Sequence, residues 1–146
     1  MVAPQVFFHY ESKMPTLNKK KAVRSFIPEI FKKENRPFKQ LDYIFCSDEY
    51  LLEINRTHLQ HDDYTDIITF DLSRDEKIMG EIYISIDRVK ENATTYKTTF
   101  STEMHRVLFH GALHLCGYKD KTKKEITLMR QKEEEYLLLL EDFQPE

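Results

Sequence analysis

The chain has 146 residues, of which 40% are hydrophobic and 32% charged, and its formal net charge is −3 at pH 7. This length suits one domain with one hydrophobic core. The sequence has no run of 18 or more apolar residues, so we expect no membrane-spanning helix and no membrane partner. The acidic balance disfavours a protein that binds nucleic acid over its whole surface, although basic side chains outnumber acidic ones between residues 13 and 39.

The N-terminal segment and the cysteines indicate a cellular compartment. The first residues, MVAPQV, lack the basic segment, apolar core and small-residue cleavage site of a secretory signal, so we expect a cytoplasmic protein. Cys46 and Cys116 are far apart and have no paired spacing of the kind seen in disulfide frameworks or zinc sites with four cysteines. We therefore expect both thiols to be buried and reduced.

A first strand is predicted over Val6–His9, followed by an amphipathic helix over residues 18–34 with Asn18 as its N-cap. Because Pro28 lacks the backbone N–H that a helix interior uses, we expect it to kink or divide this helix. The lysines of the helix lie on the face opposite its apolar residues. This basic face is either a solvated surface or an electrostatic footprint for phosphates.

Aromatic and β-branched residues predict three more strands, over Leu41–Cys46, Tyr64–Leu72 and Glu81–Ile86. Between the first two of these, Ser47 can cap a helix over residues 48–60. The last strand alternates strictly, with isoleucines on one face and polar or aromatic residues on the other. This pattern is typical of a strand with one face packed on a core.

Three helices are predicted in the remainder of the chain. A polar helix covers residues 87–97, a second helix runs from a cap at Ser101 to about Leu115, and Gly117 supplies its C-terminal stop. Thr122 and Glu125 have capping-box spacing and open the last helix. This order of elements predicts an α+β fold, in which a single domain over residues 1–146 packs about five helices with a small mixed sheet of about four strands.

The segment with the clearest chemistry contains His110, His114 and Asp120. Two histidines four residues apart on a helix differ by about 40° around the axis and about 6 Å along it, so both imidazoles can reach one ion. Gly117 can adopt the left-handed conformation that ends the helix, and the reversed chain can carry Asp120 back toward the rings. Two nitrogens and one oxygen leave one tetrahedral position open for water, which is the arrangement of a catalytic zinc site.

A zinc ion in such a site activates water and polarises a phosphoryl or carbonyl oxygen, which predicts hydrolysis. Zinc peptidases of the HExxH type carry a glutamate base after the first histidine, but this chain has Gly111 there, so peptidase chemistry is disfavoured. The histidine spacing also occurs by chance on amphipathic helices, and Asp120 can equally be an exposed turn residue. We expect His105 to support the site from behind or to lie on the surface.

The same residues resemble a known family. The segment from His110 to Asp120 reads HGALHLCGYKD and resembles the HGxLHLxGYDH signature of the YbeY endoribonucleases, which act in bacterial ribosomal RNA maturation. The three metal-binding histidines of the family fall on His110, His114 and position 120, where this chain has Asp120. Aspartate is a competent zinc ligand, but it adds a negative charge and has a shorter reach. The aspartate that precedes the third histidine in the family is Lys119 here.

Two upstream segments are similar to the same family in matching order. The segment from Ile54 to Phe70 keeps the Thr65-Asp66 pair and the apolar strand after it, and GEIYIS from Gly80 resembles the Gly-Asp-Ile-x-Ile-Ser strand of the family. In this alignment the functional arginine of the family falls on Leu59 and its proline falls on Tyr64. Arg56, one helical turn earlier, is either a substitute for that cation or a chance surface arginine.

The resemblance implies a zinc-dependent endoribonuclease with one Zn²⁺ per chain, acting on single-stranded RNA in ribosomal RNA maturation and ribosome quality control. Its partners would be precursor ribosomal RNA and the ribosome or its assembly factors. His110, His114 and Asp120 would hold the metal, while Thr65, Asp66 and Arg56 would line the catalytic cleft. The basic residues that we expect to bind the RNA backbone are Lys19, Lys20 and Arg24.

Two alternatives remain open. The missing arginine and the acidic net charge are also typical of a ribosome-assembly binding module that keeps a structural metal. A metal hydrolase with this site could instead act on a small phosphoester or an amide rather than on RNA.

Overall fold

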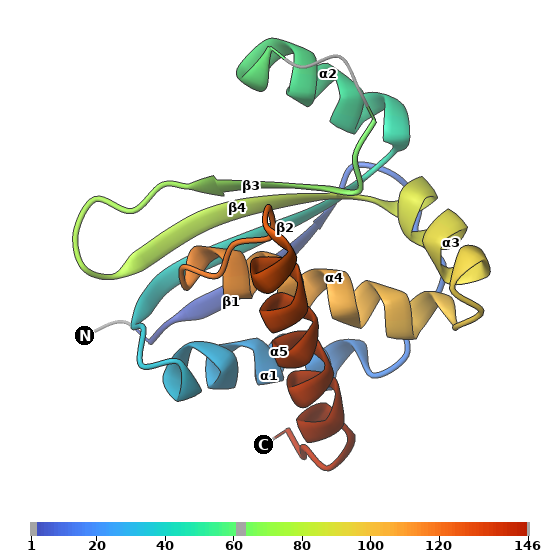
Figure 1. Cartoon of the computed structure of the whole chain (residues 1–146). Coiled ribbons are helices and arrows are strands. Elements are labelled where there is room, and N and C mark those ends of the chain that lie inside the picture. Colours follow the sequence, from blue (N-terminus) through green and yellow to red (C-terminus); the bar gives the residue numbers. More distant parts are fainter. Residues whose placement is uncertain (1–2, 61–63, 146) are drawn as a thin grey trace.

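The computed structural model describes residues 3–60 and 64–145, which form four strands and five helices (Figure 1). In chain order these elements are β1 (Gln5–Tyr10), α1 (Lys20–Lys33), β2 (Phe38–Cys46), α2 (Asp48–Leu59), β3 (Ile67–Asp71), β4 (Ile78–Ser85), α3 (Ile86–Thr95), α4 (Phe100–Leu115) and α5 (Lys123–Glu141). The α+β class predicted from the sequence is confirmed. Within this part of the chain no helix is long and apolar enough to cross a bilayer.

The four strands form one mixed sheet in the order β1-β2-β4-β3. β1 pairs with β2, and β2 with β4, in parallel, whereas β3 runs antiparallel to β4. In this register Ile84 lies beside Phe45 on one neighbour and beside Ile67 on the other. The predicted small mixed sheet is therefore confirmed, and β3 forms one of its two edges.

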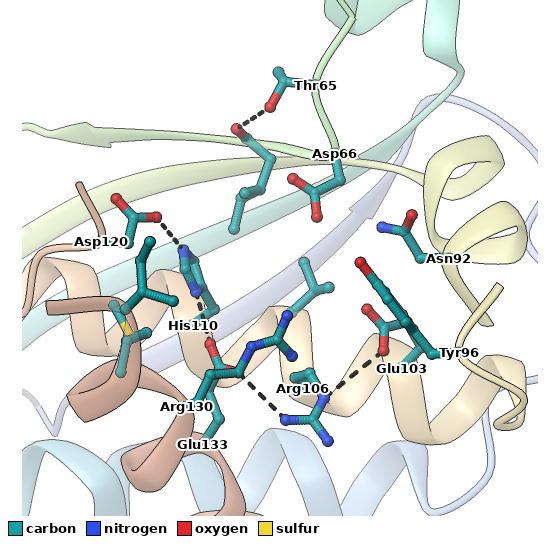
Figure 2. Close-up of a pocket in the computed structure, with 14 residues that line it drawn as sticks. Thr65, Asp66, Asn92, Tyr96, Glu103, Arg106, His110, Asp120, Arg130 and Glu133 are labelled. Carbon is teal, nitrogen blue, oxygen red and sulfur yellow. Dashed lines mark hydrogen bonds and ion pairs between the residues drawn. The ribbon is translucent and has the colours of Figure 1, made fainter. Parts of the chain in front are cut away.

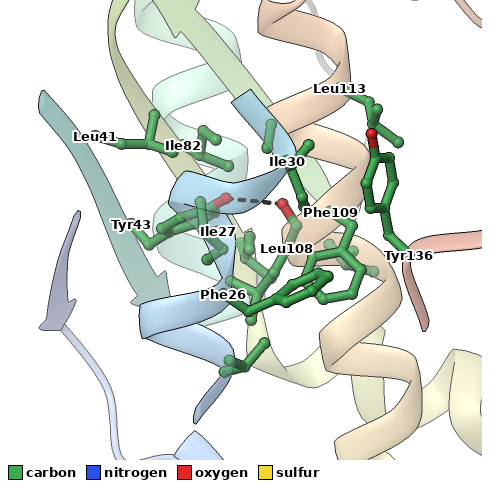
Figure 3. Close-up of a cluster of buried hydrophobic side chains, with 14 of the residues drawn as sticks. Phe26, Ile27, Ile30, Leu41, Tyr43, Ile82, Leu108, Phe109, Leu113 and Tyr136 are labelled. Carbon is green, nitrogen blue, oxygen red and sulfur yellow. Dashed lines mark hydrogen bonds between the residues drawn. The ribbon is translucent and has the colours of Figure 1, made fainter. Parts of the chain in front are cut away.

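Helices cover both faces of this sheet (Figure 1). The main core fills the face toward α1, α4 and α5, where Ile82 and Ile84 of β4 are fully buried. In this core the Tyr43 hydroxyl donates a 2.8 Å hydrogen bond to the carbonyl oxygen of Leu108, which ties β2 to α4 (Figure 3). α2 packs on the opposite face over a smaller cluster of Cys46, Leu51 and Ile68.

The prediction that β4 packs one face on a core is confirmed, since buried residues alternate with half-buried ones along the strand, and α2 partly covers the other face. Tyr83, on the face toward α2, is partly buried and packs against the smaller cluster. The strand begins earlier than predicted, at Ile78, and Ile86 begins α3 instead of continuing the strand. Ser85 ends the strand because its hydroxyl accepts a hydrogen bond from the backbone N–H of Arg88 and so caps α3.

The amphipathic helix predicted near residues 18–34 is confirmed, but two N-caps are corrected. Lys19, in the left-handed conformation with φ of 56°, is the N-cap of α1, and Thr99 caps α4. Asn18 and Ser101 are instead joined by a 2.9 Å hydrogen bond from the Asn18 N–H to the Ser101 hydroxyl. Both residues are therefore used in a contact between two elements, which spacing along the chain does not reveal.

Several local predictions are confirmed. Ser47 caps α2, and Thr122 and Glu125 form the predicted capping box of α5. Cys46 and Cys116 are buried free thiols, as expected. Burial raises the pKa of the Cys46 thiol to about 12, with a further contribution from the charge of Glu11. Pro28 lies inside α1, but the helix is continuous, so the predicted division does not occur.

Candidate active site

An open cleft of about 340 Å³ lies between the start of β3 and the helices α3, α4 and α5 (Figure 2). Its polar lining combines four carboxylates, two guanidinium groups and one imidazole, together with Thr65, Asn92 and Tyr96. The carboxylates are Asp66, Glu103, Asp120 and Glu133, the guanidinium groups are Arg106 and Arg130, and the imidazole is His110. Of the residues that the sequence assigned to a catalytic cleft or a metal, Thr65, Asp66, His110 and Asp120 meet here.

The turn after α4 brings Asp120 back to His110. Gly117 has φ of +109°, and the N–H of Tyr118 donates to the carbonyl of Leu113 at 3.1 Å while the N–H of Gly117 donates to that of His114 at 3.0 Å. These two bonds form a Schellman motif, which reverses the chain at the helix end. As a result, Asp120 Oδ2 lies 3.1 Å from His110 Nε2.

The orientation of His110 is set from behind by Glu133 of α5. Oε2 of this carboxylate lies 2.7 Å from Nδ1, so Nδ1 donates the hydrogen bond and Nε2 faces Asp120 and the cleft. Burial alone would lower the pKa of His110, but the hydrogen bond and charge of Glu133 raise it above its ordinary value, and Asp120 adds to this. Glu133 is only 3% exposed, so this pair is held within the packed interior.

His114 is exposed at the rim beside this pair and is not part of the cleft wall. Its Nδ1 lies 3.0 Å from the carbonyl oxygen of Tyr118, which leaves Nε2 directed away from the backbone. The rings of His110 and His114 are nearly parallel, at 6°, with centroids 6.4 Å apart. The hydroxyl of Tyr118 donates a 2.7 Å hydrogen bond to Glu34, the C-cap residue of α1, and this bond anchors the turn that supports His114.

A partly buried charge network, which the sequence did not predict, supports this site. Arg106 of α4 pairs with Glu133 at 3.4 Å, with Glu103 at 3.7 Å, and with Glu134. Burial raises the pKa of Glu103, and Arg106 only partly offsets this effect. One signal in the sequence could have revealed Glu133, because it interrupts the apolar stripe of α5 formed by Met129, Tyr136 and Leu140.

The donor atoms suit a divalent metal in their chemistry, and two of the three predicted ligands also suit it in their spacing. Each histidine directs Nδ1 to an oxygen acceptor, as metal-binding histidines do, and keeps Nε2 for an ion. Two donors at about 2.0–2.1 Å from one tetrahedral ion lie about 3.3 Å apart, close to the 3.1 Å between His110 Nε2 and Asp120 Oδ2. His114 does not complete the set, and within residues 3–60 and 64–145 no group of three such side chains is assembled to hold a metal.

Asp66 occupies the opposite wall of the cleft, at the start of β3 (Figure 2). Its backbone carbonyl accepts a 2.9 Å hydrogen bond from the N–H of Ser85, which fixes the start of β3 against the end of β4. Burial raises the pKa of the Asp66 carboxyl, and nearby His110 only partly lowers it. Thr65 donates a weak 3.4 Å hydrogen bond from its hydroxyl to the carbonyl of Ile67.

Other residues singled out in the sequence lie elsewhere. Arg56 is on α2, whose helix packs on the other face of the sheet, and its guanidinium lies 3.3 Å from Glu53, so the structure does not bring it into the cleft. Leu59 is the last residue of α2 and is 41% exposed. His105 is buried and its Nε2 contacts the carbonyl of Asn18 at 2.9 Å, which corrects its predicted place near the metal or on the surface. Residues 61–63 of the upstream motif lie outside the described residues.

The basic residues at the start of α1 form a surface separate from the cleft. Lys19, Lys20 and Arg24 are exposed. The ammonium group of Lys20 lies 4.6 Å from the ring centroid of Tyr10, and the guanidinium carbon of Arg24 lies 5.8 Å from that of Phe8. This part of α1 therefore faces β1, with basic and aromatic side chains interleaved.

A family model described as Endoribonuclease YbeY matches residues 7–141. The chain belongs to the YbeY family. The protein named Endoribonuclease YbeY from Cytophaga hutchinsonii is 53% identical over 135 residues, covering 92% of this chain and 94% of that relative. The protein of the same name from Christiangramia forsetii is 49% identical over 123 residues, covering 84% and 86%. The resemblance inferred from the three motifs is confirmed.

A solved structure also shares this YbeY fold. The solution structure of TM1509 from Thermotoga maritima is 28% identical in sequence and superposes with a TM-score of 0.65, covering 94% of this chain and 89% of the other. The fold whose sheet and helices place His110 opposite Asp66 is therefore also found in an experimentally solved structure.

Proposed function

We propose that this YbeY family member is a zinc-dependent endoribonuclease that hydrolyses single-stranded RNA in ribosomal RNA maturation and ribosome quality control. The observation that carries the proposal is the unit of Glu133, His110 and Asp120, in which a buried carboxylate directs an imidazole nitrogen toward a second carboxylate in an open cleft. The names of its relatives supply the substrate class.

His110, His114 and Asp120 would hold one Zn²⁺ per chain, for which the exposed His114 ring would have to turn toward the other two ligands. When bound, the ion would supply a Lewis acid that activates water and polarises a phosphate oxygen. The net acidic lining of the cleft supports this assignment, because four carboxylates against two guanidinium groups would otherwise repel a polyanionic RNA. A divalent cation would turn this repulsion into attraction at the position of the scissile phosphate.

The residues of the chain itself would carry out the remaining steps. Asp66, across the cleft from His110, accepts a hydrogen bond from the attacking water and orients it toward phosphorus, while Thr65 lines the entry to the same wall. Glu133 keeps the His110 ring in one orientation, and Arg106 keeps Glu133 in place. The cleft thus positions water and phosphate on rigid elements, which is the main requirement for in-line displacement.

The partners are precursor ribosomal RNA and the ribosome or its assembly factors, in the cytoplasm. At the start of α1, away from the cleft, Lys19, Lys20 and Arg24 would contact the RNA backbone, because their charges are exposed and Lys20 and Arg24 lie beside aromatic rings of β1.

The test is metal analysis coupled to RNA cleavage. Purified protein should bind about one zinc per chain and cleave a single-stranded RNA, and both His114→Ala and Asp120→Ala should lower zinc content and cleavage together. Cleavage that His114→Ala leaves unchanged would overturn the metal-dependent mechanism. If the protein turned over a small phosphoester faster than RNA at equal zinc content, RNA would not be its preferred substrate.

One observation favours a second function, a ribosome-assembly binding module with a structural metal. The functional arginine of the family is replaced by Leu59, and Arg56 does not reach the cleft. Complementation of a deletion strain separates the two functions. Restoration of normal ribosome profiles by the double variant His114→Ala, Asp120→Ala supports the binding module, and failure of this variant supports the nuclease.

A further inference from the structure

The two guanidinium groups of the cleft have different surroundings. Arg106 is committed to three carboxylates, those of Glu103, Glu133 and Glu134. Arg130, one helical turn before Glu134 on α5, is exposed and has no carboxylate within ion-pair distance among the residues that the structure describes. A phosphate that enters the cleft would therefore find Arg130 available and Arg106 already neutralised.

Arg130 reaches across the cleft toward Tyr96, at the end of α3 (Figure 2). Its guanidinium carbon lies 6.0 Å from the centroid of the tyrosine ring, at the outer limit of a cation–π contact, so the contact is weak and the guanidinium can turn to an anion. Tyr96 is 57% exposed, and among the large hydrophobic side chains of the described residues only Leu138 is more exposed. An exposed aromatic ring beside an uncommitted cation is the combination on which proteins stack a base and hold its phosphate.

Asn92 adds a polar group to the same corner of the cleft. It lies one helical turn before Tyr96 on α3, and its amide points into the cleft (Figure 2). Within the described part of the chain no side-chain hydrogen bond engages this amide. An amide carries both donors and an acceptor, so it can pair with the edge of a base that stacks on the neighbouring ring.

We propose that Tyr96 and Arg130 form a nucleotide-binding subsite for single-stranded RNA at the edge of the cleft between α3 and α5. The ring of Tyr96 stacks on one base, and the Arg130 guanidinium pairs with the phosphate joined to the same sugar. This subsite rests on the proposed endoribonuclease function and specifies which nucleotide-sized part of the substrate is held next to His110.

The charge distribution supports this position. Besides Arg130 and Tyr96, the ionisable groups of the wall are His110, which would bind the proposed metal, Arg106, which is neutralised, and carboxylates, which repel a phosphate. Electrostatics therefore leave one place in the cleft, other than the proposed metal, where an RNA phosphate is favoured. Because base stacking tolerates any base, the subsite would bind single strands with little sequence preference.

Binding of a labelled, non-cleavable 2′-O-methyl single strand to the full-length, zinc-loaded protein tests the subsite. Arg130→Met should weaken binding about tenfold and reduce the slope of log Kd against log salt concentration by about one phosphate contact. Tyr96→Leu should weaken binding at least about fivefold without changing this slope, and Tyr96→Phe, which keeps the ring, should bind as the parent protein does. A variant that had merely lost structure would not show this pattern, in which Arg130→Met changes both affinity and salt slope and Tyr96→Leu changes affinity alone.

Arg74→Met is the matched control, because Arg74 is an exposed arginine in the turn between β3 and β4, away from the cleft. Its binding should remain within about twofold of the parent protein. Parent-like affinity and salt slope in both Arg130→Met and Tyr96→Leu would overturn the subsite. Cleavage of the unmodified strand by the parent protein is measured in parallel, so that absence of cleavage identifies a failure of the proposed function instead.

Discussion

Oε2 of Glu133 lies 2.7 Å from Nδ1 of His110, so a buried residue of α5 sets the direction in which an imidazole of α4 faces the cleft. Hydrogen-bonded partners of this kind fix the tautomer and ring orientation of a metal-binding histidine. This hydrogen bond joins α4 to α5, which contact each other in the core, so the packing of the two helices determines how His110 is oriented.

Glu133→Ala should therefore lower zinc affinity by about 10–100-fold, because the His110 ring loses the partner that orients it. Competition with a chromophoric chelator measures this change. Glu134→Ala is the matched control, since it removes another partner of Arg106 without touching His110. Equal zinc affinity of Glu133→Ala and Glu134→Ala would contradict the orienting role, provided that circular dichroism shows both to be folded.

Tyr118→Phe should destabilise the protein by about 1–2 kcal/mol, because the Tyr118 hydroxyl donates a 2.7 Å hydrogen bond to the Glu34 carboxylate. Glu34 keeps its contacts with Tyr136 and Lys132, so the loss should be at the lower end of the range for bonds to charged groups. Urea unfolding measures the change. Tyr96→Phe, which removes a hydroxyl from an exposed ring, should leave the unfolding midpoint nearly unchanged, and an equal midpoint for Tyr118→Phe would refute the expectation.

Gly111→Ala should destabilise the fold despite the higher helix propensity of alanine. A Cβ at position 111 would lie 2.9 Å from Cδ1 and 3.0 Å from Cγ2 of Ile82, and 3.1 Å from Cδ1 of Ile67, so α4 could no longer approach the sheet as closely. Overpacking costs about 1–3 kcal/mol against about 1 kcal/mol gained in propensity, which predicts a net loss of up to about 2 kcal/mol.

The double variant Gly111→Ala, Ile82→Val tests this explanation by thermal or urea unfolding. Ile82→Val removes the Cδ1 methyl that would collide with the new Cβ. The two substitutions should couple favourably, so that the double variant is more stable than the sum of the single changes predicts. Simple additivity would show that crowding against Ile82 is not the cause.

His105 should make the stability of the protein depend on pH between about 7 and 5. Burial lowers the pKa of His105 below its ordinary value, and the hydrogen bond to the carbonyl of Asn18 only partly offsets this. The unfolded chain then binds the proton more readily than the folded one, so stability is complete above the unfolded pKa and falls as pH decreases toward the folded pKa.

Replacement by an amide isolates this contribution. His105→Gln keeps a donor for the Asn18 carbonyl but does not titrate, so the difference in unfolding free energy between the two proteins should shift in favour of the variant as the pH falls from 7 to 5. Lys19 is the charged neighbour that adds to the effect, and it stays positive over this range. A difference that is constant with pH would show that His105 is not held neutral.

The class of the fold and most of its local features follow from the amino-acid sequence alone. The apolar stripe of α1, the caps at Ser47 and Thr122 and the stop at Gly117 were predictable, because each depends on residues a few positions apart. The spacing of His110 and His114 on one helix, followed by a reversal toward Asp120, was predictable for the same reason.

Which distant residues complete the cleft becomes apparent when the strands and helices are packed together. Asp66 faces His110 because β3 is the edge strand beside β4, and Glu133 reaches the same ring because α5 packs across α4. Arg56 is the opposite case. Its position one helical turn before Leu59, where the functional arginine of the family falls, suggested a place in the site, whereas α2 packs on the other face of the sheet. Short-range patterns encode caps and faces, but contacts between distant elements follow from the packing of the whole core, which no local spacing specifies.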